Sequence, residues 1–387
     1  MAETPKKDTK SDPSSDVTYP IMSLASRYHL LTQCSKSDLE ADLKAEIKDI
    51  KAVHLWEAWG GKLGWGEVTA EVKKAYDEEE QGLKDELKKA EESSGETEIL
   101  DAYFGLSNFY SRTGSLALSL STLDSILSLP KLSTSKKIHA LLGKARVLMF
   151  FDRSPTDVVA ACDDAAEKGG DWDKRNRLKV YKALDAVSRR DFKKAAELLA
   201  GCVKTFSADE LVDFKEFCTY TVLLSVLHMP RPSLKKDVID GPEILAVVPS
   251  GSPVRLVAER LYDCDYSGYF RAVAGLEPSL RESRYMSSHA SYLVRELVVL
   301  GYAQFLQSYK SCTLAAMAET FAVPQPYLDA HLSRFIAAGR LQCKIDKVGG
   351  VVETVRADGR NAQYKRLVEE GDKVLNKLQR LSRVVDV

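Results

Sequence analysis

The sequence predicts a mostly α-helical protein in which a tetratricopeptide-like helical solenoid is followed by a winged helix and a final heptad helix. Three patterns support this fold class. Helical segments recur at a spacing of about 37 residues from residue 96 onward. The period of the apolar residues changes from helical to alternating at Gly339. Apolar residues then recur at gaps of three and four between Tyr364 and Val385.

The composition is that of an ordinary globular protein, with 44% hydrophobic residues in a chain of 387. Its 55 basic and 56 acidic residues leave a net charge of −1, so we expect no general attraction to nucleic acid or anionic membranes. We expect no membrane span and no secretory signal, because the sequence has neither a long apolar run nor an apolar N-terminal segment. Seven cysteines without a Cys-x-x-Cys pair favour a reducing compartment, the cytoplasm or nucleus.

Residues 1–20 are rich in lysine, aspartate, serine and threonine, a composition that predicts a disordered tail. Residues 21–95 are predicted to form N-terminal helices. These begin with a short amphipathic helix after Asp38 and end with a highly charged helix over 67–92. The stretch "WGGKLGWGE" between them, with its Gly60-Gly61 pair, predicts a turn.

Residues 96–207 are predicted to form helical repeats. Helical segments begin near Thr97, Ser135 and Asp171. Each segment is followed by a helix breaker and a second helix, and the breakers are Thr113-Gly114, Asp152 to Pro155, and Arg190-Asp191. Helix pairs of this kind bury one face against the next pair, which builds a solenoid.

Residues 208–356 are predicted to form a further domain whose last part, about 290–356, is a winged helix. Thr313 is placed to cap the N-terminus of a helix. A second helix ends at Gly339, where a left-handed residue is needed. The segments "RLQCKID" and "VVETV" predict two strands, which a hairpin turn at "KVGG" joins.

Residues 357–387 are predicted to form a C-terminal bundle helix. Its apolar seam repeats every seven residues and consists of Tyr364, Leu367, Gly371, Val374, Leu378, Leu381 and Val385. A single helix cannot bury such a seam on its own, so we expect other helices, from this chain or another, to cover it.

The residues that enzymes and metal sites need are not grouped in this sequence. Its six histidines are spread along the chain with no His-x-x-x-His, and "GGKLGWG" lacks the spacing of a phosphate-binding loop. The sequence has no Gly-x-Ser-x-Gly motif, and Cys343 lies in the apolar phase of a strand, which favours a core residue over a nucleophile. We therefore expect no enzyme activity, no metal and no cofactor.

Two regions outside the heptad helix are candidate protein interfaces. The segment "DWDKRNRLK" carries Lys174, Arg175 and Arg177, and three interpretations stay open: a solvated helix start capped by Asp171 or Asp173, a subunit contact, and an RNA-binding patch. The predicted hairpin leaves a strand edge whose main-chain groups a neighbouring protein can pair. The candidate residues at this edge and on the adjacent helix are Arg334, Leu341, Cys343, Lys344, Ile345 and Val352.

A winged helix is also a common DNA-binding fold, but the outer face of the second helix is poor in side chains that contact bases. It offers Arg334, with Asp329 nearby, and the charges of the hairpin nearly cancel. Nucleic-acid binding is therefore the weaker interpretation of this region.

Four stretches of the sequence resemble the PCI-domain family, which scaffolds the proteasome lid, the signalosome and translation initiation factor three. They are "GGDWDKRNRLKVY" (169–181), "RDFKKAAELL" (190–199), "LSRFIAAGRLQCKIDKV" (332–348) and, near the C-terminus, "GDKVLNKLQRLSRV". Within that family they are most similar to the non-ATPase subunit 6 family of the 26S proteasome regulatory particle lid. The resemblance implies that residues 208–356 are a PCI domain.

The resemblance also implies a function, that of a non-catalytic scaffold subunit supporting lid assembly and the degradation of ubiquitinated proteins. The implied partners are other lid subunits, both PCI neighbours and deubiquitinase-bearing subunits, with indirect contact to the ATPase base and core particle. No membrane and no nucleic acid are expected as partners. The alternatives are a signalosome scaffold subunit and, from another class, a winged-helix protein that binds nucleic acid.

Overall fold

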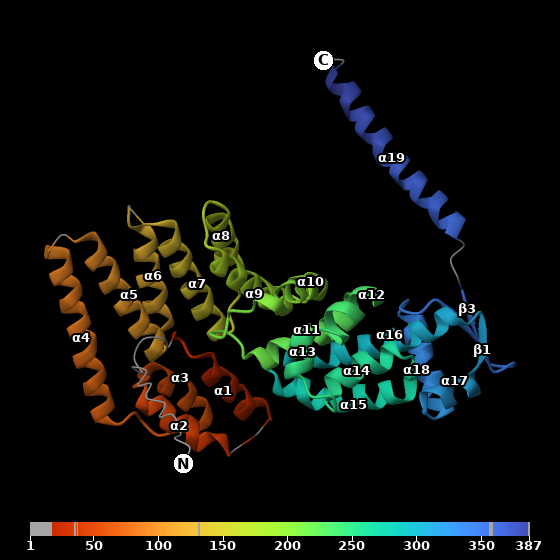
Figure 1. The fold of residues 1–387 in the computed structure, drawn as a ribbon, viewed down its shortest axis with the longest axis horizontal. Helices are drawn as coiled ribbons and strands as arrows, with labels where there is room; N and C mark the ends of the chain where they lie inside the picture. The colour runs from red at the N-terminus through yellow and green to blue at the C-terminus, as the bar shows by residue number, and fades with distance from the viewer. Residues whose placement is uncertain are drawn as a thin grey trace, which may run out of the picture. The chain divides into compact units, whose positions relative to one another are not determined.

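The computed structural model describes residues 18–34, 36, 38–93, 95–130, 132–355 and 359–385. Within these residues the chain is almost entirely helical, with one small sheet (Figure 1). The chain divides into two compact units, which we describe separately: Met1–Tyr262 with Ala272–Val294, and Asp263–Arg271 with Arg295–Val387. The predicted disordered tail, residues 1–20, lies outside the described residues as far as residue 17.

The first unit is a succession of helices. Their bounds are α1 Met22–Cys34, α2 Leu39–Asp49, α3 Val53–Leu63, α4 Ala70–Ser93, α5 Glu96–Thr113, α6 Leu116–Ser128, α7 Thr134–Phe150, α8 Thr156–Glu167, α9 Trp172–Ser188, α10 Phe192–Cys202, η1 Val203–Thr205, α11 Phe214–His228, α12 Arg231–Ser233, η2 Leu234–Ile239, α13 Pro242–Val247 and α14 Pro253–Tyr262. The chain passes between the two units within α15 (Tyr266–Glu282) and α16 (Ala290–Ser308), and η3 (Ser287–His289) separates these helices.

Helices α4 to α10 form the solenoid that the spacing predicts. Each of them packs against the next one along the chain, and α4 to α7 stand side by side in Figure 1. The starts of α5, α7 and α9 agree with the predicted repeat starts to within one residue. Because each helix pair contacts mainly its sequence neighbours, this part of the fold follows directly from the local pattern.

The turns inside the helix pairs share one backbone feature. Gly114, Asp152 and Arg190 are left-handed, with φ of 83°, 53° and 64°, and they follow one another at intervals of 38 residues. After each of them, the next N–H donates to the carbonyl five residues back, at 2.9 to 3.1 Å. This bond satisfies a helix-end carbonyl that has no partner within the helix, so it ends the helix cleanly.

The Gly60-Gly61 pair corrects one sequence-based prediction, because it lies inside α3 rather than in a turn. The helix continues to Leu63 and ends at Gly64, which is left-handed with φ of 70°. Gly60 lies close to two tryptophan side chains: a Cβ on it would lie 3.2 Å from the Cβ of Trp65 and 3.7 Å from the indole ring of Trp56. Close packing, rather than a turn, is thus the use of this glycine.

The second unit contains the predicted winged helix. Its elements are β1 Ser311–Thr313, α17 Leu314–Phe321, α18 Gln325–Ala337, β2 Cys343–Asp346, β3 Val351–Thr354 and α19 Gly359–Val385. The predicted hairpin is present as β2 and β3, which pair antiparallel, but the sheet has a third strand that was not predicted: β1 pairs antiparallel with β3, and the strand order is β1-β3-β2. The three residues of β1 are too few to show a period, and only pairing with a distant strand makes them a strand.

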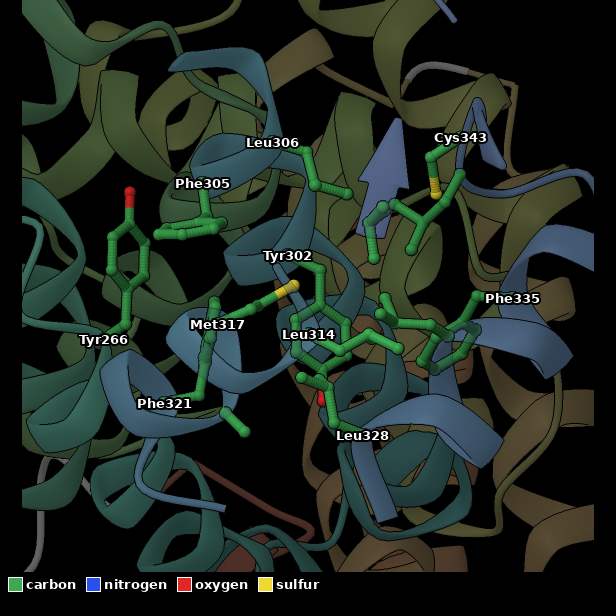
Figure 2. Packing of buried hydrophobic residues seen from close by; sticks show 14 of the residues in the cluster. Tyr266, Tyr302, Phe305, Leu306, Leu314, Met317, Phe321, Leu328, Phe335 and Cys343 are labelled. Carbon is green, nitrogen blue, oxygen red and sulfur yellow. The ribbon is translucent and has the colours of Figure 1, made fainter. Parts of the chain in front are cut away.

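The core of this unit lies between α16, the two short helices and the sheet (Figure 2). Met317 and Phe321 of α17 lie beside Tyr302 of α16, and Phe335 of α18 belongs to the same buried cluster. Both helix-end predictions are confirmed. The Thr313 hydroxyl accepts from the Ala316 N–H at 3.2 Å, and Gly339 is left-handed with φ of 69°.

Candidate protein-interaction surfaces

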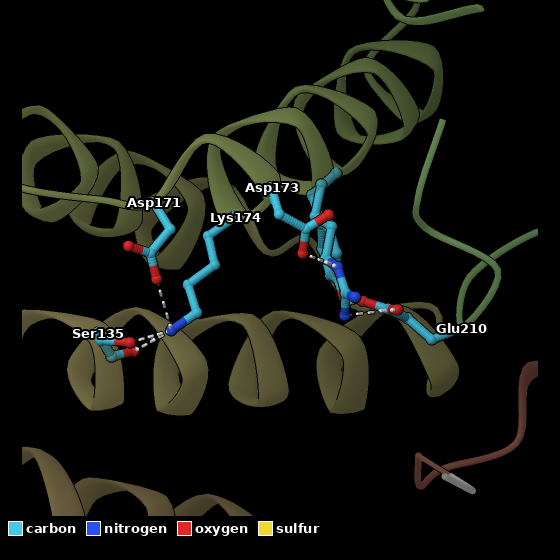
Figure 3. A network of polar contacts seen from close by, with 7 residues as sticks. Ser135, Asp171, Asp173, Lys174 and Glu210 are labelled. Carbon is cyan, nitrogen blue, oxygen red and sulfur yellow. Dashed lines mark hydrogen bonds and ion pairs between the residues drawn. The ribbon is translucent and has the colours of Figure 1, made fainter. Parts of the chain in front are cut away.

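The basic segment at the start of α9 is largely occupied by contacts within its own unit (Figure 3). Lys174 Nζ donates to the main-chain oxygen of Ser135 at 3.1 Å and also to its hydroxyl, and it lies 3.7 Å from the Asp171 carboxylate. Asp171 is the N-cap residue of α9, but its side chain makes no capping hydrogen bond. Lys174 thus ties the first turn of α9 to the first turn of α7.

Arg177 has a similar internal role. Its Nε lies 3.0 Å from Asp173 and its Nη1 lies 3.3 Å from Glu210, whose side chain is only 9% exposed. Tyr181 also donates to Glu210, at 3.2 Å, so this carboxylate collects donors from two turns of α9. Of the three basic candidates in this segment, Arg175 is the one with an exposed side chain. The network explains Arg177 through folding, because the buried Glu210 carboxylate needs such a partner, and it explains Lys174 through its bonds to Ser135.

The winged helix separates its candidate residues into inward and outward groups. Leu341, Cys343 and Val352 are buried in the unit's own core, with 6%, 4% and 0% of their surface exposed, and Ile345 packs partly against them. Their side chains are therefore not available to a partner, which corrects the sequence-based list: alternate residues of a strand point into the core. Arg334 and Lys344 are exposed.

The strand β2 remains a candidate protein-docking edge through its main chain. It stands at one end of the sheet order and, among the described residues, pairs only with β3, in the register Lys344 opposite Glu353. Around it, Lys347 lies 3.1 Å from Asp329, and Arg340 pairs with Glu296. Because these cations already have carboxylate partners, the face has little net attraction for phosphate groups.

Cys343 is a poor candidate for a nucleophile in its surroundings. Burial raises the pKa of the Cys343 thiol above its ordinary range, which disfavours the reactive thiolate. Among the described residues, no group of three or more His, Cys, Asp or Glu side chains is placed to hold a metal ion. A cavity of about 620 Å³ in the first unit includes Arg284 and Asp152, but these two groups bond to each other at 2.6 Å.

The C-terminal helix α19 presents the largest candidate surface. The large apolar side chains of this helix are between 56% and 74% exposed, and they are Tyr364, Leu367, Val368, Val374, Leu375, Leu378, Leu381, Val384 and Val385. Val368, Leu375 and Val384 were not part of the predicted seam. Val368 and Leu375 lie one position after the seam residues Leu367 and Val374, which widens the apolar face to three of every seven positions there, and Val384 lies one position before Val385. A face this wide is typical of a helix that packs against more than one neighbour.

Gly371 occupies a seam position in the middle of α19. Glycine in a helix interior costs about 1 kcal/mol relative to alanine, so the residue weakens the helix that carries it. Among the described residues, no heavy atom outside its own helix lies within 4 Å of the place where a Cβ would stand. The fold of this chain therefore supplies no packing reason for the glycine.

Among the described residues, no helix has both the length and the apolar composition needed to cross a membrane. Charged residues cover the side of α19 that lies opposite its apolar face, so the helix is amphipathic.

Comparisons with known proteins agree with this architecture along its length. The family described as 26S proteasome subunit RPN7 matches residues 67–237, and the PCI domain matches residues 272–356. A third family, described as the 26S proteasome regulatory subunit RPN7/PSMD6 C-terminal helix, matches residues 363–385 of α19. The three matches thus cover the solenoid, the winged helix and the exposed helix in turn.

Whole-length relatives point the same way. The chain is 38% identical to a 26S proteasome non-ATPase regulatory subunit 6 of Oryza sativa subsp. japonica over 95% of this chain and 97% of that protein. It is 34% identical to the 26S proteasome regulatory subunit RPN7 of Saccharomyces cerevisiae over 92% and 82%. COP9 signalosome complex subunit 1 of Arabidopsis thaliana is more distant, at 24% identity over 43% of this chain. This chain therefore belongs to the RPN7/PSMD6 family of 26S proteasome non-ATPase regulatory subunits.

Proposed function

We propose that this chain is a non-catalytic scaffold subunit of the 26S proteasome regulatory particle lid, where it supports assembly and the degradation of ubiquitinated proteins. One observation carries the proposal at the level of the structure. The helix α19 exposes a continuous apolar face in a position that matches the family's C-terminal helix. An apolar face of this length is stable in water only when other helices cover it.

Each part of the chain is assigned a role from the surface that it presents. The solenoid and residues 208–356, as a PCI domain, are proposed to be the folded parts that carry these surfaces. The main-chain edge of β2, with Arg334 and Lys344 beside it, is proposed to meet a neighbouring PCI subunit. The apolar face of α19 is proposed to join a helical bundle with other lid subunits, including deubiquitinase-bearing ones.

The wider context is part of the same proposal. Contact with the ATPase base and the core particle would be indirect, through the other lid subunits. The expected sites of action are the cytoplasm and nucleus, where a chain with free cysteines stays reduced. No catalytic role is proposed, since the relatives are named as regulatory subunits.

The test introduces one charge on the apolar face of α19 and compares it with the same charge elsewhere on this helix. Leu378→Asp places a carboxylate in the seam, whereas Asn376→Asp places one on the opposite side. Tagged chains are expressed in their own cells, purified by affinity, and the intact complexes are identified by mass spectrometry. We expect Asn376→Asp to recover lid subunits as the unsubstituted chain does, and Leu378→Asp to recover far less.

A chain truncated before Asn361 provides the second comparison. It should remain folded, because the cores of both units lie before that residue, and it should enter the lid poorly. Normal incorporation of the truncated chain and of Leu378→Asp would contradict the proposal. Recovery of signalosome subunits in place of lid subunits would favour the signalosome alternative. Recovery of the chain with nucleic acid alone, in a salt-dependent manner, would favour the nucleic-acid alternative.

A further inference from the structure

The charged residues that border the apolar face of α19 have a definite order. If the seam residues are assigned to heptad positions a and d, the wide face consists of a, d and e, and its two borders are positions b and g. The b border carries Lys365 and Asp372, and the g border carries Glu370 and Lys377. All four side chains are exposed. Charges at the borders of an apolar helix face select the partner and its orientation.

Gly371 lies between the two acidic members of these borders. Glu370 precedes it and Asp372 follows it, so one carboxylate stands on each side of the glycine. Along the face, Leu367 and Val374 are the large apolar neighbours at the seam positions before and after it. The glycine thus makes a notch in the apolar face, with large apolar side chains above and below and a carboxylate on either side.

We propose that this notch is where one helix of another lid subunit crosses α19 most closely, and that the crossing residue of that helix is a lysine or arginine. The inference rests on the proposed function. A long basic side chain fits both features of the notch, because its aliphatic part fills the space over Gly371 and its cation reaches Glu370 or Asp372. The missing Cβ lets the two helix axes approach, since the distance between packed helices depends on the side chains at their contact.

A second copy of this chain fits the notch poorly. Two α19 helices in parallel register would set Gly371 against Gly371 and leave a void in the middle of the seam, which well-packed helix interfaces avoid. The three-position width of the face also exceeds the narrow seam of a two-stranded coiled coil. A helix from a different subunit, with a large basic residue at the crossing, has neither difficulty.

The first experiment compares two glycine-to-alanine substitutions. Gly371→Ala fills the notch, and Gly82→Ala makes the same change in the middle of α4, where the added Cβ also has no neighbour within 4 Å among the described residues. Alanine favours the helix in both cases, so neither variant should reduce the helical signal in circular dichroism. We expect Gly82→Ala to enter the lid normally and Gly371→Ala to be recovered with lid subunits several-fold less, with a larger loss for Gly371→Leu.

The second experiment compares two neighbouring charge reversals. Glu370→Lys lies on the border of the apolar face, and Glu369→Lys lies on the opposite side of the helix. The two variants have the same net charge and differ only in the side of the helix that changes. We expect Glu370→Lys to lower lid recovery and Glu369→Lys to leave it unchanged. Equal recovery of both, or undiminished recovery of Gly371→Leu, would overturn the inference.

A zero-length carboxylate–amine cross-linker applied to the purified lid identifies the crossing helix. If the crossing residue is a lysine, we expect a cross-link from it to Glu370 or Asp372 that is lost in the Glu370→Gln, Asp372→Asn double variant. An arginine does not react with this reagent, and the pair of charge reversals is then the test of the crossing residue. A cross-link to a second copy of this chain would overturn the inference. The Leu378→Asp variant separates the two levels of proposal. If that variant and the chain truncated before Asn361 both assemble normally, the proposed function fails. If they assemble poorly while the Gly371 variants assemble well, only the notch assignment fails.

Discussion

Arg284 Nη2 donates to the main-chain oxygen of Met149 at 2.7 Å, and this bond joins residues that are 135 positions apart in the sequence. The same nitrogen lies 2.9 Å from the Phe150 oxygen and 2.6 Å from the Asp152 carboxylate. Met149 and Phe150 end α7, where carbonyl groups have no partner within the helix. The guanidinium of Arg284, in the segment after α15, thus donates to carbonyl groups at the end of a solenoid helix.

This relationship predicts the effect of removing the cation. Arg284→Met should lower the free energy of unfolding by about 2 kcal/mol, because the Arg284 side chain is 5% exposed and its loss removes the donor to the Phe150 oxygen, whereas the Met149 oxygen keeps the Asp152 N–H at 3.2 Å. Asp152→Asn should change stability little, since that carboxylate is 83% exposed and Asn tolerates a left-handed backbone. Urea denaturation of the three proteins measures both effects. Equal stability of Arg284→Met and the unsubstituted chain would show that the carbonyl bonds do not matter.

The end of α18 gives a prediction about backbone conformation. Gly339→Ala should destabilise the second unit by about 1 kcal/mol, because a side chain in the left-handed region crowds the following carbonyl. The Cβ itself would meet no heavy atom within 4 Å among the described residues, so crowding from elsewhere does not contribute. Gly339→Asn should cost less than Gly339→Ala, and thermal unfolding of the two variants measures the difference. The reverse order would exclude backbone conformation as the cause.

The pH dependence of stability should reflect His289. Burial and then the nearby Arg190 guanidinium hold the pKa of His289 below its ordinary value of 6.5. As the pH falls through 6.5, the unfolded chain takes up a proton that the folded chain still refuses, so stability present above this pH is lost as the pH approaches the folded pKa. Burial lowers the pKa of His139 and His331 in the same direction, so all three contribute to this loss.

Replacement of His289 should therefore reduce the loss of folding stability at acid pH and leave the stability at alkaline pH unchanged. Arg190 Nε donates to His289 Nδ1 at 3.1 Å, and the side-chain oxygen of a glutamine in place of this histidine can accept the same bond. We expect His289→Gln to reduce the loss of stability between about pH 7 and pH 5, where histidines titrate, and to leave the stability at about pH 8 nearly unchanged. A denaturation series across pH tests this, and an unchanged slope would exclude His289 as a contributor.

The outer face of the winged helix gives a prediction about partners. Reversal of Arg334 and Lys344 together, both of which are exposed, should reduce recovery of lid subunits more than it changes any affinity for nucleic acid. Co-purification measures the first effect and a labelled-RNA shift at physiological salt measures the second. Unchanged lid recovery in this double variant would remove the outer face from the proposed interface and leave the main-chain edge of β2.

The local elements of this fold could be read from the sequence because their signals are local. The helix ends at Gly114 and Gly339 follow from the backbone freedom of glycine, and the Thr313 cap follows from a hydroxyl three residues before an N–H. Contacts between distant segments could not be read in this way. The strand β1 exists only through its pairing with β3, and Lys174 has an internal partner only because α7 packs against α9.

The candidate interfaces also divide into features that follow from one segment and features that depend on contacts between segments. The sequence by itself determined the exposed seam of α19, since a single helix with a heptad pattern cannot bury its own apolar side chains. It also determined the family, through stretches of residues rather than through geometry. The strand pattern already favoured a core position for Cys343, but only the tertiary structure decided that Leu341 and Val352 are buried with it, because a strand pattern shows that one face is buried but not against what. Burial and pairing are properties of two segments brought together, and a pattern in one segment carries no information on the other.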